Sequence, residues 1–280
     1  LVISEWYFTA IVPPAQNSIY YFPGYVEIYN NSDSTIYLDG KVFGAGWSIS
    51  SDFLPGRPCA DDIQLRDDRR GIFARFMQAF PGAGTDHPLA PGAAVVIATD
   101  AIDHTQLVEG TMDLSGADFE FFGPTDVDNP AVHNMIDVGL APWIMGHGLF
   151  FLPLGAGSEV PFIADPVDIS ALPVELDPDD ISGSPRAFVR YPGDKILDIA
   201  TFRDRLNSEL DAECLRMVNV KFDRVEGYFL PSTNAAVSTH RRVAGFRANG
   251  QAILQRTRTS AADFMVGPFN PGIPPAAFRR

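Results

Sequence analysis

The sequence predicts an all-β protein, and two observations support this prediction. The chain of 280 residues contains 24 glycines, 23 prolines and 21 phenylalanines, while only 20% of its residues are charged. Frequent turn residues and many aromatic side chains are typical of short strands joined by turns. In addition, Val26, Ile28, Ile36 and Leu38 alternate with more polar residues around an Asn-Asn-Ser-Asp turn, which predicts a hairpin with one buried face.

The elements of the N-terminal half follow from local patterns. Residues 1–8 are rich in aromatic and β-branched side chains and predict a strand. The hairpin is expected over residues 24–40, with Asn30, Asn31 and Asp33 forming its turn. Residues 71–80 are the best helix candidate in this half, because their apolar side chains recur at near-helical spacing. These side chains, interpreted as a core stripe, are Ile72, Phe73, Phe76, Met77 and Phe80.

Further along the chain, residues 88–98 combine a turn ending in Pro91-Gly92 with a short apolar run, which predicts a buried strand. This segment is one of five phrases that, taken in order, resemble the lamin-tail domain. The phrases are residues 24–40, 88–98, 193–202, 237–242 and 253–264. Within the last phrase, Arg256 and Arg258 stand where acidic or amide residues are common in that family.

The resemblance implies an immunoglobulin-like, lamin-tail-type β-sandwich with long loop insertions and one or two short helices. It implies a single domain over residues 1–280, with insertions at about 44–88 and 103–190 and a Pro-rich C-terminal tail at 267–280. The spacing looks closest to large lamin-tail-like proteins of bacterial surfaces, which are often lipoproteins. None of the matching phrases is a catalytic motif, so the resemblance is specific for fold and weak for activity.

The charge balance limits the partners. A formal net charge of −14 repels phosphate backbones and anionic lipids, which disfavours nucleic acid as a partner. No apolar run reaches the roughly 18 to 20 residues that a membrane helix needs. Cationic residues crowd the C-terminal part at Arg241, Arg242, Arg247, Arg256, Arg258, Arg279 and Arg280, opposite an acidic run at Glu175, Asp177, Asp179 and Asp180. This asymmetry is either solvated surface or a head-to-tail contact between copies.

The two cysteines, Cys59 and Cys214, would form a disulfide in an exported protein, and two buried thiols are the alternative. Neither cysteine lies in a Cys-x-x-Cys or metal-ligand pattern, which disfavours redox catalysis and zinc. The first residue is Leu1, which fits either a mature exported protein or a trimmed sequence.

A calcium site is one interpretation of the loop between Pro124 and Pro130. Asp126, Asp128 and Asn129 place three hard oxygen ligands close together there. The glycine and the distal glutamate of an EF-hand are missing from this loop. A turn capped by its own Asp and Asn side chains is therefore the alternative.

The catalytic motifs of common enzyme classes are absent. No Gly-x-Ser-x-Gly, His-Glu-x-x-His, Walker or Gly-x-Gly-x-x-Gly sequence occurs, so hydrolase, metalloprotease and nucleotide-binding activities lack their residues. Asp86-His87 and Asp103-His104 repeat an acid–imidazole pair, but adjacent strand residues point to opposite faces. We expect these histidines at the surface or in turns.

These observations predict a non-enzymatic, secreted or cell-surface structural or adhesive protein that self-associates into an extracellular assembly such as a filament. The expected contacts are the first strand and the tail. Their residues are Trp6, Tyr7, Phe8, Phe269, Ile273, Phe278, Arg279 and Arg280. The alternative is a monomeric module that binds a polysaccharide or protein ligand through aromatic loop residues such as Trp47 and Trp143.

Overall fold

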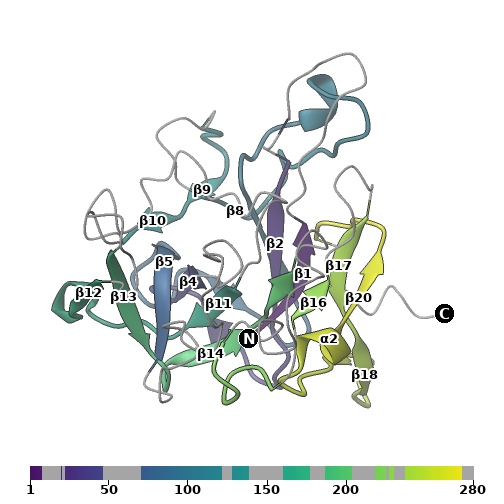
Figure 1. Ribbon diagram of the computed structural model, residues 1–280. Helices are drawn as coiled ribbons and strands as arrows, with labels where there is room; N and C mark the ends of the chain where they lie inside the picture. The colour runs from purple at the N-terminus through teal and green to yellow at the C-terminus, as the bar shows by residue number, and fades with distance from the viewer. Residues whose placement is uncertain are drawn as a thin grey trace, which may run out of the picture.

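The computed structural model describes residues 1–7, 20, 23–46, 71–121, 128–138, 160–176, 187–203, 218–224, 227–229 and 237–272. In these ranges the protein is mostly β, with several sheets and almost no helix (Figure 1). The all-β prediction is confirmed at this level. Among the described helices, none is long and apolar enough to cross a membrane.

The first large sheet has seven strands in the order β20-β17-β1-β2-β7-β8-β9. Its strands are β1 (Val2–Tyr7), β2 (Tyr25–Tyr29), β7 (Ala94–Ala98), β8 (Phe119–Glu120), β9 (His133–Asn134), β17 (Ser238–Arg241) and β20 (Phe264–Gly267). The strands predicted at 1–8 and 88–98 are therefore confirmed. The N-terminal strand β1 lies inside the sheet, antiparallel to β2 on one side and to β17 on the other.

The second large sheet follows the order β12-β13-β5-β4-β11-β14, with β10 pairing on β5. Its strands are β4 (Val42–Gly46), β5 (Gly71–Ala79), β10 (Ile136–Asp137), β11 (Val160–Ala164), β12 (Val174–Leu176), β13 (Ala187–Pro192) and β14 (Ile196–Ile199). Strand β14 lies within residues 193–202, one of the five phrases of the lamin-tail resemblance. The ranges 44–88 and 103–190, expected as loop insertions, contribute several of these strands.

Short elements complete the described fold. Three two-stranded pairs are formed by β3 (Ile36–Tyr37) with β6 (Pro88–Leu89), β15 (Phe202–Arg203) with β16 (Tyr228–Phe229), and β18 (Val243–Phe246) with β19 (Ala252–Leu254). The helices are η3 (His104–Gln106), η4 (Ile169–Ala171) and α2 (Ser260–Asp263). Each of these helices is a single turn, so the fold depends on sheet packing.

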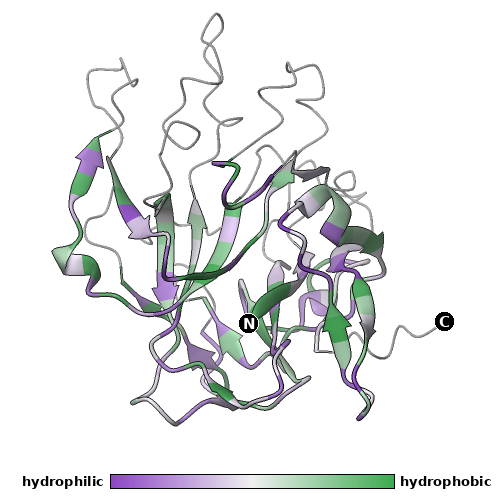
Figure 2. Cartoon of the chain, turned by 90° about the horizontal axis from the view of Figure 1, so that it is seen from below, coloured by the Kyte–Doolittle hydropathy of each residue, from purple (hydrophilic) through white to green (hydrophobic). Residues whose placement is uncertain are grey.

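The two large sheets share one hydrophobic core. Ile3, Trp6 and Ile97 of the first sheet belong to the same buried cluster as Phe43 and Phe162 of the second. The Trp6 ring stacks against Phe43, with the ring centroids 6.4 Å apart. Figure 2 shows strands whose apolar residues are interrupted by polar ones, as expected where one face of a strand is buried more deeply than the other.

The helix predicted over residues 71–80 is wrong, because this segment is strand β5. β5 is hydrogen-bonded to β4 on one side and to β13 on the other. Residues that point to opposite faces of the strand, such as Phe76 and Met77, are both buried. A strand buried on both faces is a continuous apolar run, and its spacing alone does not distinguish it from a buried helix.

The predicted pairing of the opening hairpin is also wrong. Strand β2 forms as expected, but it pairs with β1 and β7, while β3 pairs with the distant β6. Asn30 does hold the turn, since its Oδ1 accepts a hydrogen bond of 3.0 Å from the Ser32 amide. Its Nδ2 also donates to the Leu89 carbonyl at 2.8 Å, which ties the turn to β6.

Candidate functional site

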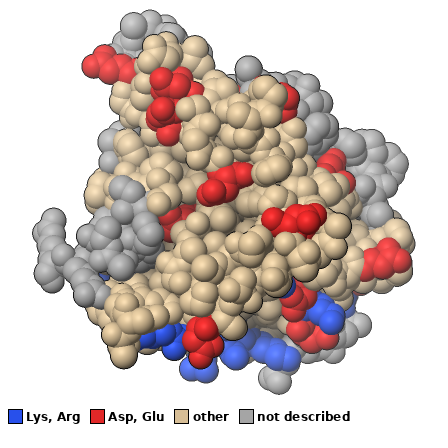
Figure 3. All heavy atoms as spheres, turned by 180° about the vertical axis from the view of Figure 1, so that it is seen from behind, with Lys and Arg blue, Asp and Glu red and all other residues tan. Residues whose placement is uncertain are grey.

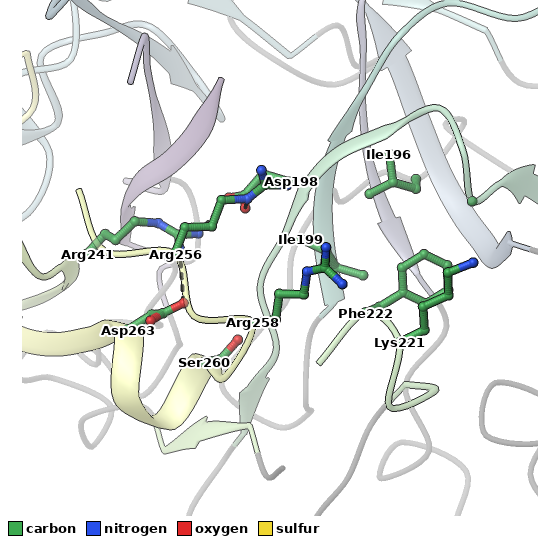
Figure 4. A pocket seen from close by; sticks show the side chains of 11 residues that line it. Ile196, Asp198, Ile199, Lys221, Phe222, Arg241, Arg256, Arg258, Ser260 and Asp263 are labelled. Atoms are coloured by element: carbon green, nitrogen blue, oxygen red, sulfur yellow. Dashed lines mark hydrogen bonds and ion pairs between the residues drawn. The ribbon is translucent and has the colours of Figure 1, made fainter. Parts of the chain in front are cut away.

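A small pocket opens beside the C-terminal helix α2, between β14 and residues 219–224 (Figure 4). Its volume is about 120 Å³. Four cationic residues and two acidic ones contribute to its lining, namely Lys221, Arg241, Arg256, Arg258, Asp198 and Asp263. This density of positive charge contrasts with the net charge of −14 of the whole chain.

The floor of the pocket is a buried cluster of charges around Arg241. The Nη2 of Arg241 lies 2.5 Å from Asp198 Oδ2, and the Nη1 of Arg241 lies 3.5 Å from Asp263 Oδ2. The Arg241 guanidinium also lies 4.6 Å above the centre of the Phe264 ring. Because its Nε donates to the Ile3 carbonyl, the guanidinium is held by strand β1 as well as by both carboxylates.

Both carboxylates of the pocket are occupied by donors from the protein. Asp198 accepts the Ile3 amide at 3.0 Å and the Arg256 Nε at 3.2 Å, in addition to Arg241. Asp263 accepts the Thr257 amide at 2.9 Å. Neither carboxylate is arranged as a free base or as a vacant cation ligand.

Lys221 and Arg258 are the cations that these carboxylates do not neutralise. Within the described residues, neither side chain takes part in an ion pair, and both residues are exposed. Arg258 has a φ of +61°, the one positive φ of a non-glycine residue in the described ranges. Its carbonyl accepts the Arg224 amide at 2.8 Å, which fixes this turn against residues 219–224.

A hydrogen-bonded layer beneath the pocket positions the segment that carries Arg258. Thr201 donates its amide to Ser260 Oγ at 2.9 Å and its hydroxyl to Asp223 Oδ2 at 2.7 Å. The Ser260 amide donates to the same Asp223 oxygen at 3.1 Å. Ser260, the first residue of α2, is thereby hydrogen-bonded both to Thr201, which follows β14, and to Asp223 in the segment that carries Lys221.

The basic residues are unevenly distributed over the molecular surface. On the face shown in Figure 3, Lys and Arg side chains gather along the lower edge, whereas acidic side chains are scattered over the rest. One residue of the acidic run that was predicted to contact arginines of another copy forms an ion pair within the chain: Glu175 pairs with Arg190 at 2.5 Å. Asp177, Asp179 and Asp180 lie outside the described residues.

The calcium loop is only partly described, because Asp126 lies outside the described residues. Asp128 Oδ1 accepts a hydrogen bond of 2.7 Å from Asn134. Asn129 donates to the Ala101 carbonyl at 2.8 Å and accepts the Ala131 amide at 3.1 Å. These bonds are those of a capped turn, and no group of three or more His, Cys, Asp or Glu residues that could hold a metal ion occurs in the described part of the chain.

The residues predicted to contact other copies are largely internal where they are described. Trp6 and Tyr7 are each 1% exposed, and Phe269 packs on the Tyr7 ring with centroids 5.7 Å apart. The Trp6 and Tyr7 rings therefore offer almost no free surface to a second copy, whereas Phe269 is half-buried. The other predicted contacts and the two cysteines, namely Phe8, Ile273, Phe278, Arg279, Arg280, Cys59 and Cys214, lie outside the described residues.

His104 was predicted at the surface or in a turn; it lies in the single turn of η3 but is fully buried. Its Nε2 donates to the Asp100 carbonyl at 2.9 Å, and its Nδ1 accepts the Tyr20 hydroxyl at 2.7 Å. Burial lowers the pKa of His104 below its usual value. The adjacent Asp103 instead caps η3 through the Thr105 amide, so the two residues do not form a catalytic pair.

Sequence reasoning missed the charged cluster of the pocket. It noted Arg256 and Arg258 as departures from a family pattern, and it noted the excess of arginines near the C-terminus. It did not connect them with Asp198, because 58 positions separate Asp198 from Arg256. The available sign was Asp198 itself, a charged residue inside a strand-like apolar run.

Comparison with known proteins corrects the family assignment. The model of a family described as a protein of unknown function, DUF4876, matches residues 90–157. The crystal structure of a DUF4876 family protein from Bacteroides thetaiotaomicron VPI-5482 matches with a TM-score of 0.72 and 22% identity, over 98% of this chain and 71% of that chain. No curated protein matches the sequence. The lamin-tail resemblance is therefore wrong, and the chain shares the fold of a bacterial DUF4876 protein.

Proposed function

We propose that this protein is a non-enzymatic binding module whose C-terminal pocket holds one anionic group of an extracellular ligand, such as a carboxylate or sulfate of an acidic polysaccharide. A pocket of about 120 Å³ is smaller than the usual site for a whole small molecule. It suits a single charged group on a longer chain. The same proposal includes an exported location and an immunoglobulin-like form of the two sheets, and the shared core of the sheets supports the second of these.

The observation that carries this proposal is the backbone of Arg258. A φ of +61° is favourable for glycine and costs a side-chain-bearing residue about 1 kcal/mol or more. An arginine at this position is explained if its guanidinium is needed in the pocket. Strain at a position of this kind is common where a side chain serves binding.

The arrangement of the two carboxylates supports binding rather than catalysis. Asp198 and Asp263 are both engaged by Arg241, so the pocket presents cations toward a ligand and keeps its acids covered. Arg256 is half exposed and contributes a second guanidinium at the rim. Planar guanidinium groups bind carboxylates and sulfates through paired hydrogen bonds.

Calorimetric titration with oligosaccharides of equal length tests the proposal. The probes are a carboxylated oligogalacturonate, a sulfated oligosaccharide and a neutral maltohexaose. We expect binding of at least one acidic probe, no binding of the neutral probe, and weaker affinity at higher salt. Binding of the neutral probe with equal affinity, or of none of the three, would contradict the proposal.

Two variants and one control sharpen this test. Arg258→Gly relaxes the backbone and removes the guanidinium, so affinity should fall about tenfold, or about 1.4 kcal/mol, while the folded state is not weakened. Lys221→Gln should reduce affinity similarly. Arg242→Gln removes one exposed arginine that does not line the pocket, so it should leave affinity unchanged. Equal losses in all three variants would indicate a nonspecific charge effect.

A further inference from the structure

Two buried glutamates face each other on the outer side of the first sheet. Glu5 of β1 and Glu27 of β2 are directly opposite in the antiparallel register and are 2% and 1% exposed. The register shifts between Ile3 and Glu5, so that Ser4 is an extra residue in β1. A bulge of this kind turns two successive side chains toward the same side of a strand. Ser4 and Glu5 thus both reach Glu27, and the Ser4 hydroxyl donates to Glu27 Oε1 at 2.7 Å.

Glu5 is the acceptor at the centre of a hydrogen-bond network that spans three strands. Its Oε1 accepts hydrogen bonds from the Tyr25 hydroxyl and the Ser238 hydroxyl. The Nε2 of His240 lies 3.5 Å from the same oxygen. Several donors on one oxygen are the pattern expected for a carboxylate.

The C-terminal segment, residues 268–272, lies across this network, and we name it the strap. The Asn270 amide donates to Glu5 Oε1 at 3.1 Å and to the Tyr25 hydroxyl oxygen at 3.2 Å. The Pro268 carbonyl accepts from His240 Nε2 at 2.7 Å. Phe269 packs on Tyr7, so polar and aromatic contacts both hold the strap on its own sheet.

Glu27 is the group whose charge this arrangement does not balance. The titratable groups that face the two glutamates are Tyr25 from β2, His240 from β17 and Asp118 beside β7. Burial raises the pKa of Glu27 to about 8; the Ser4 hydroxyl and the Gly272 amide oppose this shift, while Glu5 and Asp118 add to it. Burial also raises the pKa of Tyr25 well above its usual value, so the phenol remains a donor to Glu5.

We propose that protonated Glu27, opposed to the hydrogen-bonded carboxylate of Glu5, is a latch that keeps the strap on the sheet, and that loss of this proton in mildly alkaline solution releases the strap. Two carboxylates opposite each other in a low-dielectric site repel strongly. The strap is the element whose displacement would expose both carboxyl groups to water, because its Asn270 amide lies on Glu5 and its Gly272 amide lies on Glu27. Its release uncovers the stacked rings of Tyr7 and Tyr25, whose centroids are 5.7 Å apart.

Amide hydrogen exchange, corrected for the intrinsic effect of pH, tests this latch in the full chain. In the wild type, the protection factor of the Asn270 amide should fall at least tenfold between pH 7 and pH 9.5. The Arg242 amide, which donates to the Asp263 carbonyl away from the latch, serves as the internal control and should keep its protection. Full protection of Asn270 at pH 9.5 would overturn the proposal.

The Glu27→Gln variant separates the latch from general alkaline loosening. Glutamine keeps the size and the hydrogen bond to Ser4 but has no proton to lose, so Asn270 should stay protected at pH 9.5. A pH profile identical to that of the wild type would overturn the proposal. If this variant does not fold, ¹³C NMR of the Glu27 carboxyl group in the wild type provides the test. We expect the carboxyl group to titrate over the same pH range in which the Asn270 amide loses its protection. Titration over a separate pH range would contradict the latch.

Discussion

Asp198 and Asp263 share the guanidinium of Arg241, whereas Glu5 and Glu27 lie opposite each other among hydroxyls, amides and a histidine. All four carboxyl groups are almost completely buried. Burying a carboxylate is costly unless a cation or a proton neutralises it. The first pair is neutralised by a permanent cation and the second by a proton. The two regions should therefore respond to different perturbations, the first to mutation of arginine and the second to pH.

The largest expected effect is from Arg241→Met, which leaves Asp198 and Asp263 buried without their shared cation. Breaking a buried pair in this way costs about 3 to 5 kcal/mol. Urea unfolding followed by circular dichroism measures the change in the free energy of unfolding. Arg242→Met is the matched control, because Arg242 is exposed and should contribute under about 1 kcal/mol. Equal losses in the two variants would refute the assignment of Arg241 as the buried counter-ion.

The second-largest expected effect is the pH dependence that Glu27 contributes to the free energy of unfolding. Its pKa is raised from 4.5 to about 8 in the folded state, so its stabilising contribution is complete below pH 4.5 and is lost as the pH rises through 8. The difference in unfolding free energy between wild type and Glu27→Gln should change by up to about 1.4 kcal/mol per pH unit within this window. Urea midpoints at pH 5, 6.5, 8 and 9 provide the measurement. A constant difference between wild type and variant would contradict a raised pKa.

His104 gives a smaller effect of opposite sign, because it is a buried base that stays neutral. Burial lowers its pKa below 6.5, so its contribution is complete above pH 6.5 and is lost as the pH falls below that value. We expect the wild type to lose stability between pH 6.5 and 5 relative to His104→Gln. The loss is at most about 1.4 kcal/mol per pH unit. Parallel profiles for wild type and variant would show that His104 does not titrate differently on folding.

These buried polar groups also mark the limit of what the sequence could predict. Strand β7 was predictable because a Pro-Gly turn and an apolar run are local patterns. Strand β5 was not, because its pairing with the distant β4 and β13 and the burial of both its faces depend on tertiary structure. The same limit applies to both charged regions, since Glu5 meets Glu27 only after β1 and β2 pair with a bulge. Each glutamate inside an apolar strand was a visible sign of a buried polar group, but its partner depended on the register in which β1 and β2 pair.

The smallest expected effect concerns Asp39, an acid that is not buried in a core and that forms no ion pair with another described residue. Its carboxylate accepts the amides of Gly84, Asp86 and His87 at 3.1, 2.8 and 3.0 Å. Slight desolvation raises the pKa of Asp39, but these amides outweigh it and lower the value to about 2. The stabilising contribution is therefore complete above pH 3.8 and is lost as the pH falls through 2.

Asp39→Asn tests whether backbone amides alone can hold such a charge in solvent. The asparagine keeps one acceptor oxygen, so the urea midpoint at pH 7 should fall less than in any of the preceding variants. The difference from the wild type should shrink as the pH is lowered from 4 toward 2, because the wild-type carboxylate is protonated over that range. A difference that grows on acidification would mean that the loop at residues 82–87 is held by something other than the charge of Asp39. The Asp39 site should therefore lose its stabilising contribution in acid, whereas Glu27 should lose its contribution in alkaline solution.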